Sequence, residues 1–190
     1  MNNLILVLDF KSKFSAGFDD FFLRYNVSYT KLDGDCTAEE VKKISPKGII
    51  LTGSPFSVYK EDSIKLKKEI LELGIPVLGI CHGMQSIAYV LGKKVDAAEV
   101  SEEDLTMVEL EDSALFKGLD KNTIMLMRHS DRVYELPDGF IKTATTKDCP
   151  IAGMENTNKK IFATQFHPEK CEMGDIVLKN FVFDICGYTK

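Results

Sequence analysis

Short apolar runs alternate with longer segments of mixed character along the first half of the chain. Strands are predicted at residues 4–8, 27–32, 48–52 and 75–80, and helices at residues 14–25, 37–44, 63–73 and 84–91. Thr37 and Glu40 form the pattern of a capping box at the start of the second helix. Gly74 and Gly92 are suited to end the third and fourth helices, because glycine readily adopts the left-handed conformation found there.

The apolar runs carry hydrophobic residues at successive positions, which is typical of parallel strands that are covered on both faces. Further strands are predicted at residues 105–110, 123–127, 140–146 and 160–166, and a last helix at residues 174–186. We therefore expect one α/β domain over residues 1–190. Its architecture is a three-layer sandwich with a mostly parallel central sheet and a small antiparallel addition.

The composition is ordinary for a soluble globular protein. Of the 190 residues, 44% are hydrophobic and 28% are charged, and the formal net charge is -5. Because no basic stripe stands out, we expect no binding to nucleic acid. The N-terminal apolar run is too short for a signal peptide, and no run is long enough to cross a membrane. We expect a cytoplasmic protein without a membrane partner.

Five cysteines are spread along the chain without a C-x-x-C pair, and there are only three histidines. This pattern predicts neither a disulfide framework nor a metal site. The cysteines expected to be ordinary free thiols are Cys36, Cys149, Cys171 and Cys186.

Cys81 differs from the other cysteines because it lies between a predicted strand and a predicted helix, flanked by Gly79 and Gly83. This is the pattern of a nucleophile elbow, in which the helix passes so close to the strand that the flanking positions must be small. The first turn of the helix offers positive charge that favours a thiolate. The backbone N–H of His82 is then placed to stabilise an oxyanion. A buried core cysteine is the alternative interpretation of this pattern.

His167 is the candidate base for such a nucleophile. Pro168 favours an extended conformation at His167, and residues two apart in an extended segment face the same way. Glu169 can therefore orient the imidazole, as the third member of a catalytic triad does. Alone, this short motif is more typical of a surface turn.

A third candidate is the loop that follows the strand predicted at residues 48–52. Parallel sheets collect their sites at the carboxyl ends of strands, which places Gly53 and Ser54 beside Cys81. Their backbone N–H groups are candidates for the second oxyanion donor, although a generic turn has the same composition.

Together, these residues resemble the class I (triad-type) glutamine amidotransferases over essentially the whole chain. The shared motifs are Gly-x-Cys-x-Gly-x-Gln around Cys81, the His-Pro-Glu segment, and the small-residue loop at Gly53 and Ser54. The resemblance implies a flavodoxin-like fold and hydrolysis of L-glutamine by Cys81, His167 and Glu169. It also implies that Gln85 holds the substrate, and that the family's Ser-His-Gly-Asp motif corresponds to the segment containing His129 and Ser130.

Within this family, the chain is most similar to the amidotransferase part of GMP synthase, as residues 52–59, 128–133, 136–140 and 149–156 indicate. The resemblance implies a separate ATP pyrophosphatase subunit that receives ammonia, binds ATP and Mg, and aminates XMP. No cofactor is expected on this chain itself. Its docking surface is expected around residues 56–59 and 128–132. A domain excised from a fused enzyme is an alternative to a stand-alone subunit.

Other functions stay open at this point. They are a partner-independent γ-glutamyl hydrolase or peptidase, an amidotransferase of another pathway, and a non-catalytic regulatory homologue. The sequence also departs from the family pattern: Ser54 replaces a glycine, Asp9 is followed by Phe10, and Lys170 follows the triad glutamate. If the loop needs a positive φ at Ser54, the oxyanion hole would form only on activation.

Overall fold

The computed structural model describes residues 2–189. Within that range, a main sheet has the strand order β2-β1-β3-β4-β11-β10-β9-β6-β7, and a second sheet pairs β5 with β8. The strands are β1 (Ile5–Asp9), β2 (Tyr29–Asp33), β3 (Gly48–Leu51), β4 (Val77–Ile80), β5 (Val95–Glu102), β6 (Leu105–Leu110), β7 (Asn122–Leu126), β8 (His129–Val133), β9 (Ile141–Thr145), β10 (Gly153–Asn156) and β11 (Ile161–Thr164). The α-helices are α1 (Ser15–Tyr25), α2 (Ala38–Ile44), α3 (His82–Val90) and α4 (Gly174–Lys179).

The sheet has a parallel half and an antiparallel half. Strands β2, β1, β3, β4 and β11 run parallel, and the direction reverses at β10. The carboxyl ends of β1, β3, β4 and β11 therefore meet at one edge of the sheet. In parallel sheets this edge is where ligands bind.

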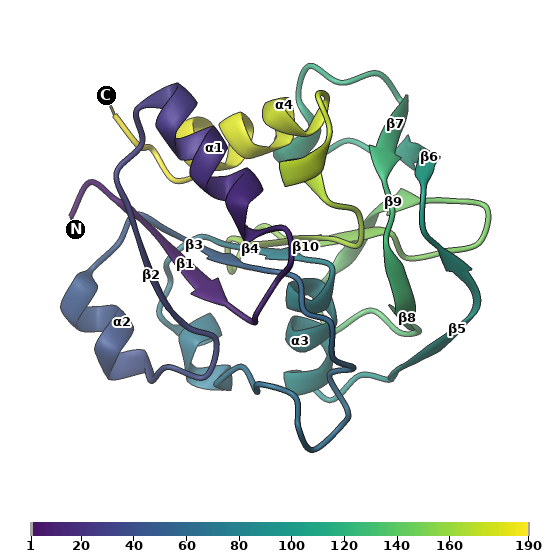
Figure 1. Ribbon diagram of the computed structural model, residues 1–190, viewed down its shortest axis with the longest axis horizontal. Coiled ribbons are helices and arrows are strands. Elements are labelled where there is room, and N and C mark those ends of the chain that lie inside the picture. Colours follow the sequence, from purple (N-terminus) through teal and green to yellow (C-terminus); the bar gives the residue numbers. More distant parts are fainter. Residues whose placement is uncertain (1, 190) are drawn as a thin grey trace.

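Helices cover both faces of the parallel half, as expected for a three-layer α/β sandwich. Figure 1 shows α1 and α4 above the sheet and α2 and α3 below it. Alternate side chains of β1 divide between the two layers, with Ile5 and Val7 packing with Phe18, and Leu6 and Leu8 with the opposite core. The expected fold class is thus confirmed.

The amphipathic helix predicted at residues 63–73 is wrong. Only a short 3₁₀ helix, Lys68–Glu72, forms there. The ammonium of Lys65 instead donates to the backbone carbonyls of Val58 and Lys60. These contacts hold the segment against the preceding loop, so tertiary packing overrides the local helical pattern.

The other helices agree better with the sequence. The capping box of α2 is present, since Thr37 accepts from the backbone of Glu40 and the Glu40 carboxylate accepts from the backbone of Thr37. Helix α3 begins at His82, directly after Cys81, rather than at Met84 as predicted. The last helix has nearly the expected extent, but it changes type: α4 passes into a π-helix, Asn180–Ile185. The Asn180 amide there donates to two carbonyls of the residue 115–117 turn.

The strands predicted from the hydrophobic pattern differ from the strands of the structure in two respects. Strand β2 lies at the edge of the sheet and alternates between exposed and partly buried residues, so it is not apolar throughout. Strands β5, β8 and β10 were not predicted from the hydrophobic pattern. The first two form a separate two-stranded sheet and are rich in polar residues, although Val95 and Val133 pack into the hydrophobic core.

Of the helices in residues 2–189, none combines the length and apolar character that crossing a membrane requires.

Candidate active site

Cys81 lies at the turn between β4 and α3, at the edge where the parallel strands end. Its backbone has φ 53° and ψ -104°, a conformation that non-glycine residues rarely adopt. The Cys81 N–H donates to the carbonyl of Thr164 at 2.8 Å, and its carbonyl accepts from Gln85 N–H at 3.1 Å. These two bonds join the turn to β11 on one side and to α3 on the other. Strain of this kind is characteristic of functional sites.

Close packing around two glycines enforces this turn. A Cβ atom at Gly79 would lie 2.8 Å from the backbone of Gly83, and one at Gly83 would overlap the carbonyl of Leu51 in β3. The elbow helix can therefore approach the sheet only where side chains are absent. The small flanking residues predicted from the sequence have this physical reason.

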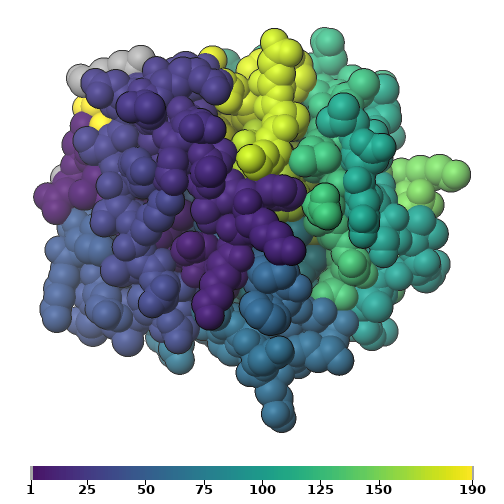
Figure 2. Space-filling view, viewed as in Figure 1, coloured from purple at the N-terminus to yellow at the C-terminus, as the bar shows by residue number. Residues whose placement is uncertain are grey.

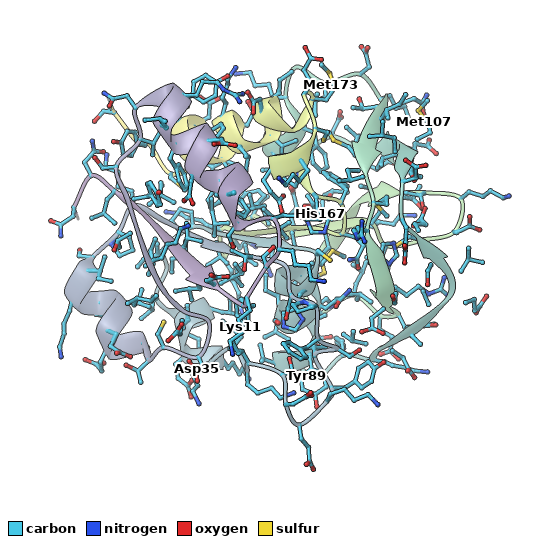
Figure 3. All side chains as sticks on the ribbon, viewed as in Figure 1. Lys11, Asp35, Tyr89, Met107, His167 and Met173 are labelled. Carbon is cyan, nitrogen blue, oxygen red and sulfur yellow. The ribbon has the colours of Figure 1, made fainter. Side chains whose placement is uncertain are left out.

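His167 and Glu169 form a buried pair beside Cys81. The Nδ1 atom of His167 lies 2.8 Å from Oε1 of Glu169. The backbone N–H of His167 donates to the carbonyl of Leu126 at 2.9 Å. His167 has an extended backbone, as the following proline predicts, and Phe14 packs edge-on against its ring. In Figure 3, His167 lies at the centre of the molecule, between the upper helices and α3.

The charge of this pair follows from its surroundings. Burial disfavours an imidazolium at His167, but the Coulombic and hydrogen-bonding contributions of Cys81 and Glu169 outweigh it and raise its pKa well above the ordinary value. The Oε2 atom of Glu169 is buried and has no protein partner. The charged ring is thus the main compensation for a buried carboxylate.

His82 has the opposite character. Its Nδ1 lies 3.0 Å from the carbonyl of Phe56, which can only accept, so Nδ1 carries the proton. Burial lowers the pKa of His82 to about 4, and the ring packs against Phe10. The ring therefore supports the loop that carries Phe56. The backbone N–H of His82 lies at the start of α3, where the first N–H groups lack intrahelical partners.

The loop at Gly53 and Ser54 lies beside Cys81, as predicted. A Cβ atom at Gly53 would come within 3.1 Å of His167 Cε1 and 3.8 Å of Cys81 Cβ. Ser54 is not among the described residues with a positive φ. The conformational penalty considered for serine at this position therefore does not arise in this conformation.

These residues surround a pocket of about 310 Å³, at the small end of the range for ligand sites. Figure 2 shows the purple, blue and green parts of the surface meeting on this face. Its lining residues are Ser12, Lys13, Phe14, Ser54, Pro55, Phe56, Ser57, Cys81, Gln85, Glu103, Arg128, His129, Ser130, Asp131 and His167.

The predicted substrate residues are held by other protein groups. Gln85 is buried, and its amide donates to the carbonyl of Asp131 at 2.8 Å and to Gln165 Oε1 at 3.2 Å. The two ring nitrogens of His129 face the carbonyl of Asp131 and the carboxylate of Glu102. Ser130 lines the pocket directly. Contacts of Gln85, His129 and Ser130 with a substrate stay predictions.

Several lining residues were not named as site candidates from the sequence. Lys13 and Phe14 come from the loop after β1, and Glu103 comes from the turn after β5. They form no compact motif, because distant loops bring them together. Arg128, which belongs to the segment 128–133 that carries the family resemblance, also lines the pocket, and its backbone carbonyl lies 3.6 Å from Cys81 Sγ.

One group in the described part of the chain offers three possible metal ligands: Glu102, His129 and Cys149, whose ligand atoms lie within 4.8 Å of one another. Burial raises the pKa of the Cys149 thiol to about 12, and His129 and Glu102 already bond each other directly at 2.9 Å. The group is thus arranged as a hydrogen-bonded cluster. The expectation of no metal on this chain stays a prediction.

Comparison with known proteins agrees with this site. The family model described as glutamine amidotransferase class-I matches residues 6–185. The chain therefore belongs to the class I glutamine amidotransferase family.

Among its relatives are glutamine-hydrolysing GMP synthases. The chain is 44% identical to that of Enterococcus faecalis over 188 residues, covering 97% of this chain and 36% of the relative. It is 43% identical to that of Bacillus subtilis, covering 98% of this chain and 37% of the relative. The chain thus spans about a third of the length of these relatives, and it corresponds to their glutamine amidotransferase part.

Solved structures show the same fold. A Thermoplasma acidophilum protein, provisionally described as one subunit of a GMP synthase, aligns with a TM-score of 0.85 and 26% identity, covering 98% of this chain and 96% of that chain. A Thermotoga maritima glutamine amidotransferase aligns with a TM-score of 0.74 and 23% identity, covering 97% and 84%.

The close packing of the elbow makes Gly83→Ala a direct test. The added methyl group would overlap the Leu51 carbonyl, so we expect a loss of about 1–3 kcal/mol in the free energy of unfolding. The measurement is denaturant unfolding with parent and variant in parallel. Equal stability of the two proteins would show that the helix does not depend on this contact.

The two histidines nearest the elbow should differ in charge at neutral pH. Nitrogen NMR of ¹⁵N-histidine protein should show His82 as a neutral ring, because its pKa is lowered, and His167 as an imidazolium, because its pKa is raised. Glu169→Gln should lower the pKa of His167 by removing a favourable charge. Titration of both rings near 6.5, their ordinary value, would contradict this arrangement.

Proposed function

We propose that this chain hydrolyses the side-chain amide of L-glutamine as the amidotransferase component of a GMP synthase. The observation that carries the proposal is the position of Cys81 on a strained elbow beside a buried His167–Glu169 pair. Membership of the amidotransferase family and the similarity to glutamine-hydrolysing GMP synthases support the choice of substrate.

In the proposed reaction, the sulfur of Cys81 attacks the amide carbon of glutamine. A carbon–sulfur bond forms, and the carbonyl electrons move onto oxygen. His167 gives its proton to the amide nitrogen, and ammonia leaves as the carbonyl re-forms in a γ-glutamyl thioester. Water then attacks this thioester with His167 as base, and glutamate and the free cysteine are released. Glu169 keeps the ring oriented throughout.

We assign oxyanion stabilisation to backbone N–H groups on the two sides of the sulfur. His82 follows the nucleophile at the start of α3, and Gly53 and Ser54 lie on the neighbouring loop. Donors fixed by the backbone require little reorganisation as charge develops on the oxygen. The position of Gly53 between Cys81 and His167 supports this assignment.

The charges around the pocket suit a free amino acid. Lys13 and Arg128 are cationic, whereas Glu103 and Asp131 are anionic, and all four line the pocket. A free amino acid carries one ammonium and one carboxylate, so it can pair with side chains of both charges. We propose that these charges orient glutamine with its side-chain amide toward Cys81.

The ammonia needs an acceptor site, since in free solution it becomes protonated near neutral pH and loses its nucleophilicity. We propose a synthetase partner that binds ATP and Mg and aminates XMP, with no cofactor on this chain. The relatives are about three times longer than this chain and so contain room for such a part. Phe56 and Arg128 both lie at the pocket mouth, which supports docking around residues 56–59 and 128–132. We place the complex in the cytoplasm.

Cys81→Ala is the direct test of the nucleophile. We expect glutamine-dependent GMP formation to fall by at least about a thousandfold, while ammonia-dependent formation is kept, because only the first reaction needs the thiol. Both rates are measured with the synthetase partner, XMP and ATP. Cys36→Ala is the control, since Cys36 is a free cysteine away from the pocket, and it should retain both activities.

The same assays separate the alternatives. Strong hydrolysis of γ-glutamyl peptides that the partner does not change would indicate an independent hydrolase. A Cys81 thiol that resists a glutamine-analogue alkylator such as diazo-oxo-norleucine under every condition would indicate a non-catalytic homologue. Transfer of ammonia to an acceptor other than XMP would place the chain in another pathway.

A further inference from the structure

A second acid–histidine pair, Glu102 and His129, lies outside the triad, and its histidine lines the pocket. The Nε2 atom of His129 lies 2.9 Å from Oε2 of Glu102, and the hydroxyl of Thr146 donates to Oε1 of the same carboxylate at 2.7 Å. Only 5% of His129 and 8% of Glu102 is exposed. Buried polar groups of this kind are costly unless every hydrogen bond is made.

Hydrogen bonds hold the pair at several points. His129 Nδ1 lies 3.0 Å from the carbonyl oxygen of Asp131, which can only accept, so Nδ1 carries a proton. On the other side of the ring, Nε2 lies 2.9 Å from Oε2 of Glu102, and Thr146 donates to the second carboxylate oxygen. The ring of His129 is therefore held at both nitrogens, and the carboxylate of Glu102 at both oxygens.

This pair is connected to the substrate side of the pocket. The Asp131 carbonyl that accepts from His129 also accepts from the amide of Gln85 at 2.8 Å. The neighbouring Arg128 carbonyl oxygen lies 3.6 Å from the sulfur of Cys81. Residues 128–131 line the pocket as one continuous segment. The ring of His129 therefore ties this wall to β5, and the Asp131 carbonyl ties the same wall to Gln85 of α3.

The wall has little other support from the main sheet. Strands β5 and β8 form their own two-stranded sheet, and its register is irregular between Ala97 and Glu102. Glu102 pairs with His129 at the end of this ladder, next to the pocket. The hydrogen bond between the side chains of Glu102 and His129 can therefore join β5 and β8 where their regular backbone pairing is interrupted.

The charged groups around the pair come from three segments. Strand β5 and the turn that follows it carry Glu99 and Glu103. Strand β8 carries Asp131, whose carboxylate accepts from the Tyr59 hydroxyl. It also carries Arg132, which donates to the backbone carbonyl of Asp148 and to the carboxylate of Glu99. The loop after β9 adds Cys149, whose pKa is raised to about 12 by burial, so this thiol is neutral. Helix α3 contributes the uncharged amide of Gln85.

We propose that Glu102 is a positioning residue for glutamine: it holds the ring of His129 and thereby fixes the wall formed by residues 128–131. This inference rests on the proposed glutaminase function. Glu102 itself does not line the pocket and acts through His129.

The experiment compares Glu102→Ala with Glu102→Gln in glutamine hydrolysis with the synthetase partner, XMP and ATP. Glu102→Ala removes both hydrogen bonds, so we expect KM for glutamine to rise about tenfold while kcat stays within about threefold. Glutamine at position 102 can donate to Nε2 of a neutral ring and accept from Thr146. It should therefore restore KM to within about threefold of the parent.

Nitrogen NMR reports on the ring of His129 independently of enzyme activity. With only three histidines in the chain, the His129 signals are separable. The Nε2 signal should report a hydrogen bond to residue 102 that is present in the parent and in Glu102→Gln and is lost in Glu102→Ala. If Glu102→Ala does not fold, Thr146→Val carries the test, because it removes only the hydroxyl at Oε1. It should raise KM several-fold with kcat retained.

An unchanged KM in Glu102→Ala, or in Thr146→Val where the first does not fold, would overturn the proposal. An equal rise of KM in both Glu102 variants, or an Nε2 signal of His129 that Glu102→Ala leaves unchanged, would do the same. Parent activity is measured first and tests the proposed function alone. The NMR spectrum does not depend on turnover, so failure of the function and failure of the positioning role are distinguishable.

Discussion

The approach of helix α3 to the sheet is the constraint on which the active site depends. Gly83 meets the carbonyl of Leu51 where any side chain would overlap it, and Gly79 faces the backbone of Gly83. Because the helix lies this close, Cys81 must turn at φ 53° and so lies at the carboxyl edge of the strands. The other parts of the site, including the loop at Gly53, are arranged around that fixed sulfur.

The two histidines nearest the elbow differ in charge because their surroundings differ. His82 is buried against a carbonyl and Phe10, so it stays neutral, whereas Cys81 and Glu169 favour the charged ring of His167. Glu102 and His129 repeat the acid–histidine pairing outside the triad. In both pairs a carboxylate fixes a ring by one short hydrogen bond.

The sequence predicted the features that depend on local rules. These include the elbow glycines, the extended His167 and the capping box at Thr37, each confirmed in the structure. It did not predict the strands of the β5–β8 sheet, because β5 is mostly exposed and the buried residues of β8 include the polar His129 and Asp131. Glu102 and Glu103 were missed with them, since only tertiary packing brings β5 to the pocket. The helix predicted at residues 63–73 failed for the same reason: contacts of Lys65 determine that segment.

The most direct measurement of the central claim is mass spectrometry of the protein after acid quenching during glutamine turnover. If Cys81 is the nucleophile, the intact mass should increase by one γ-glutamyl group, and peptide mapping should place that group on Cys81. His167→Ala should prevent the adduct from forming, because the ring no longer protonates the leaving nitrogen. Turnover of glutamine with no adduct on Cys81, or an adduct on another cysteine, would contradict the claim.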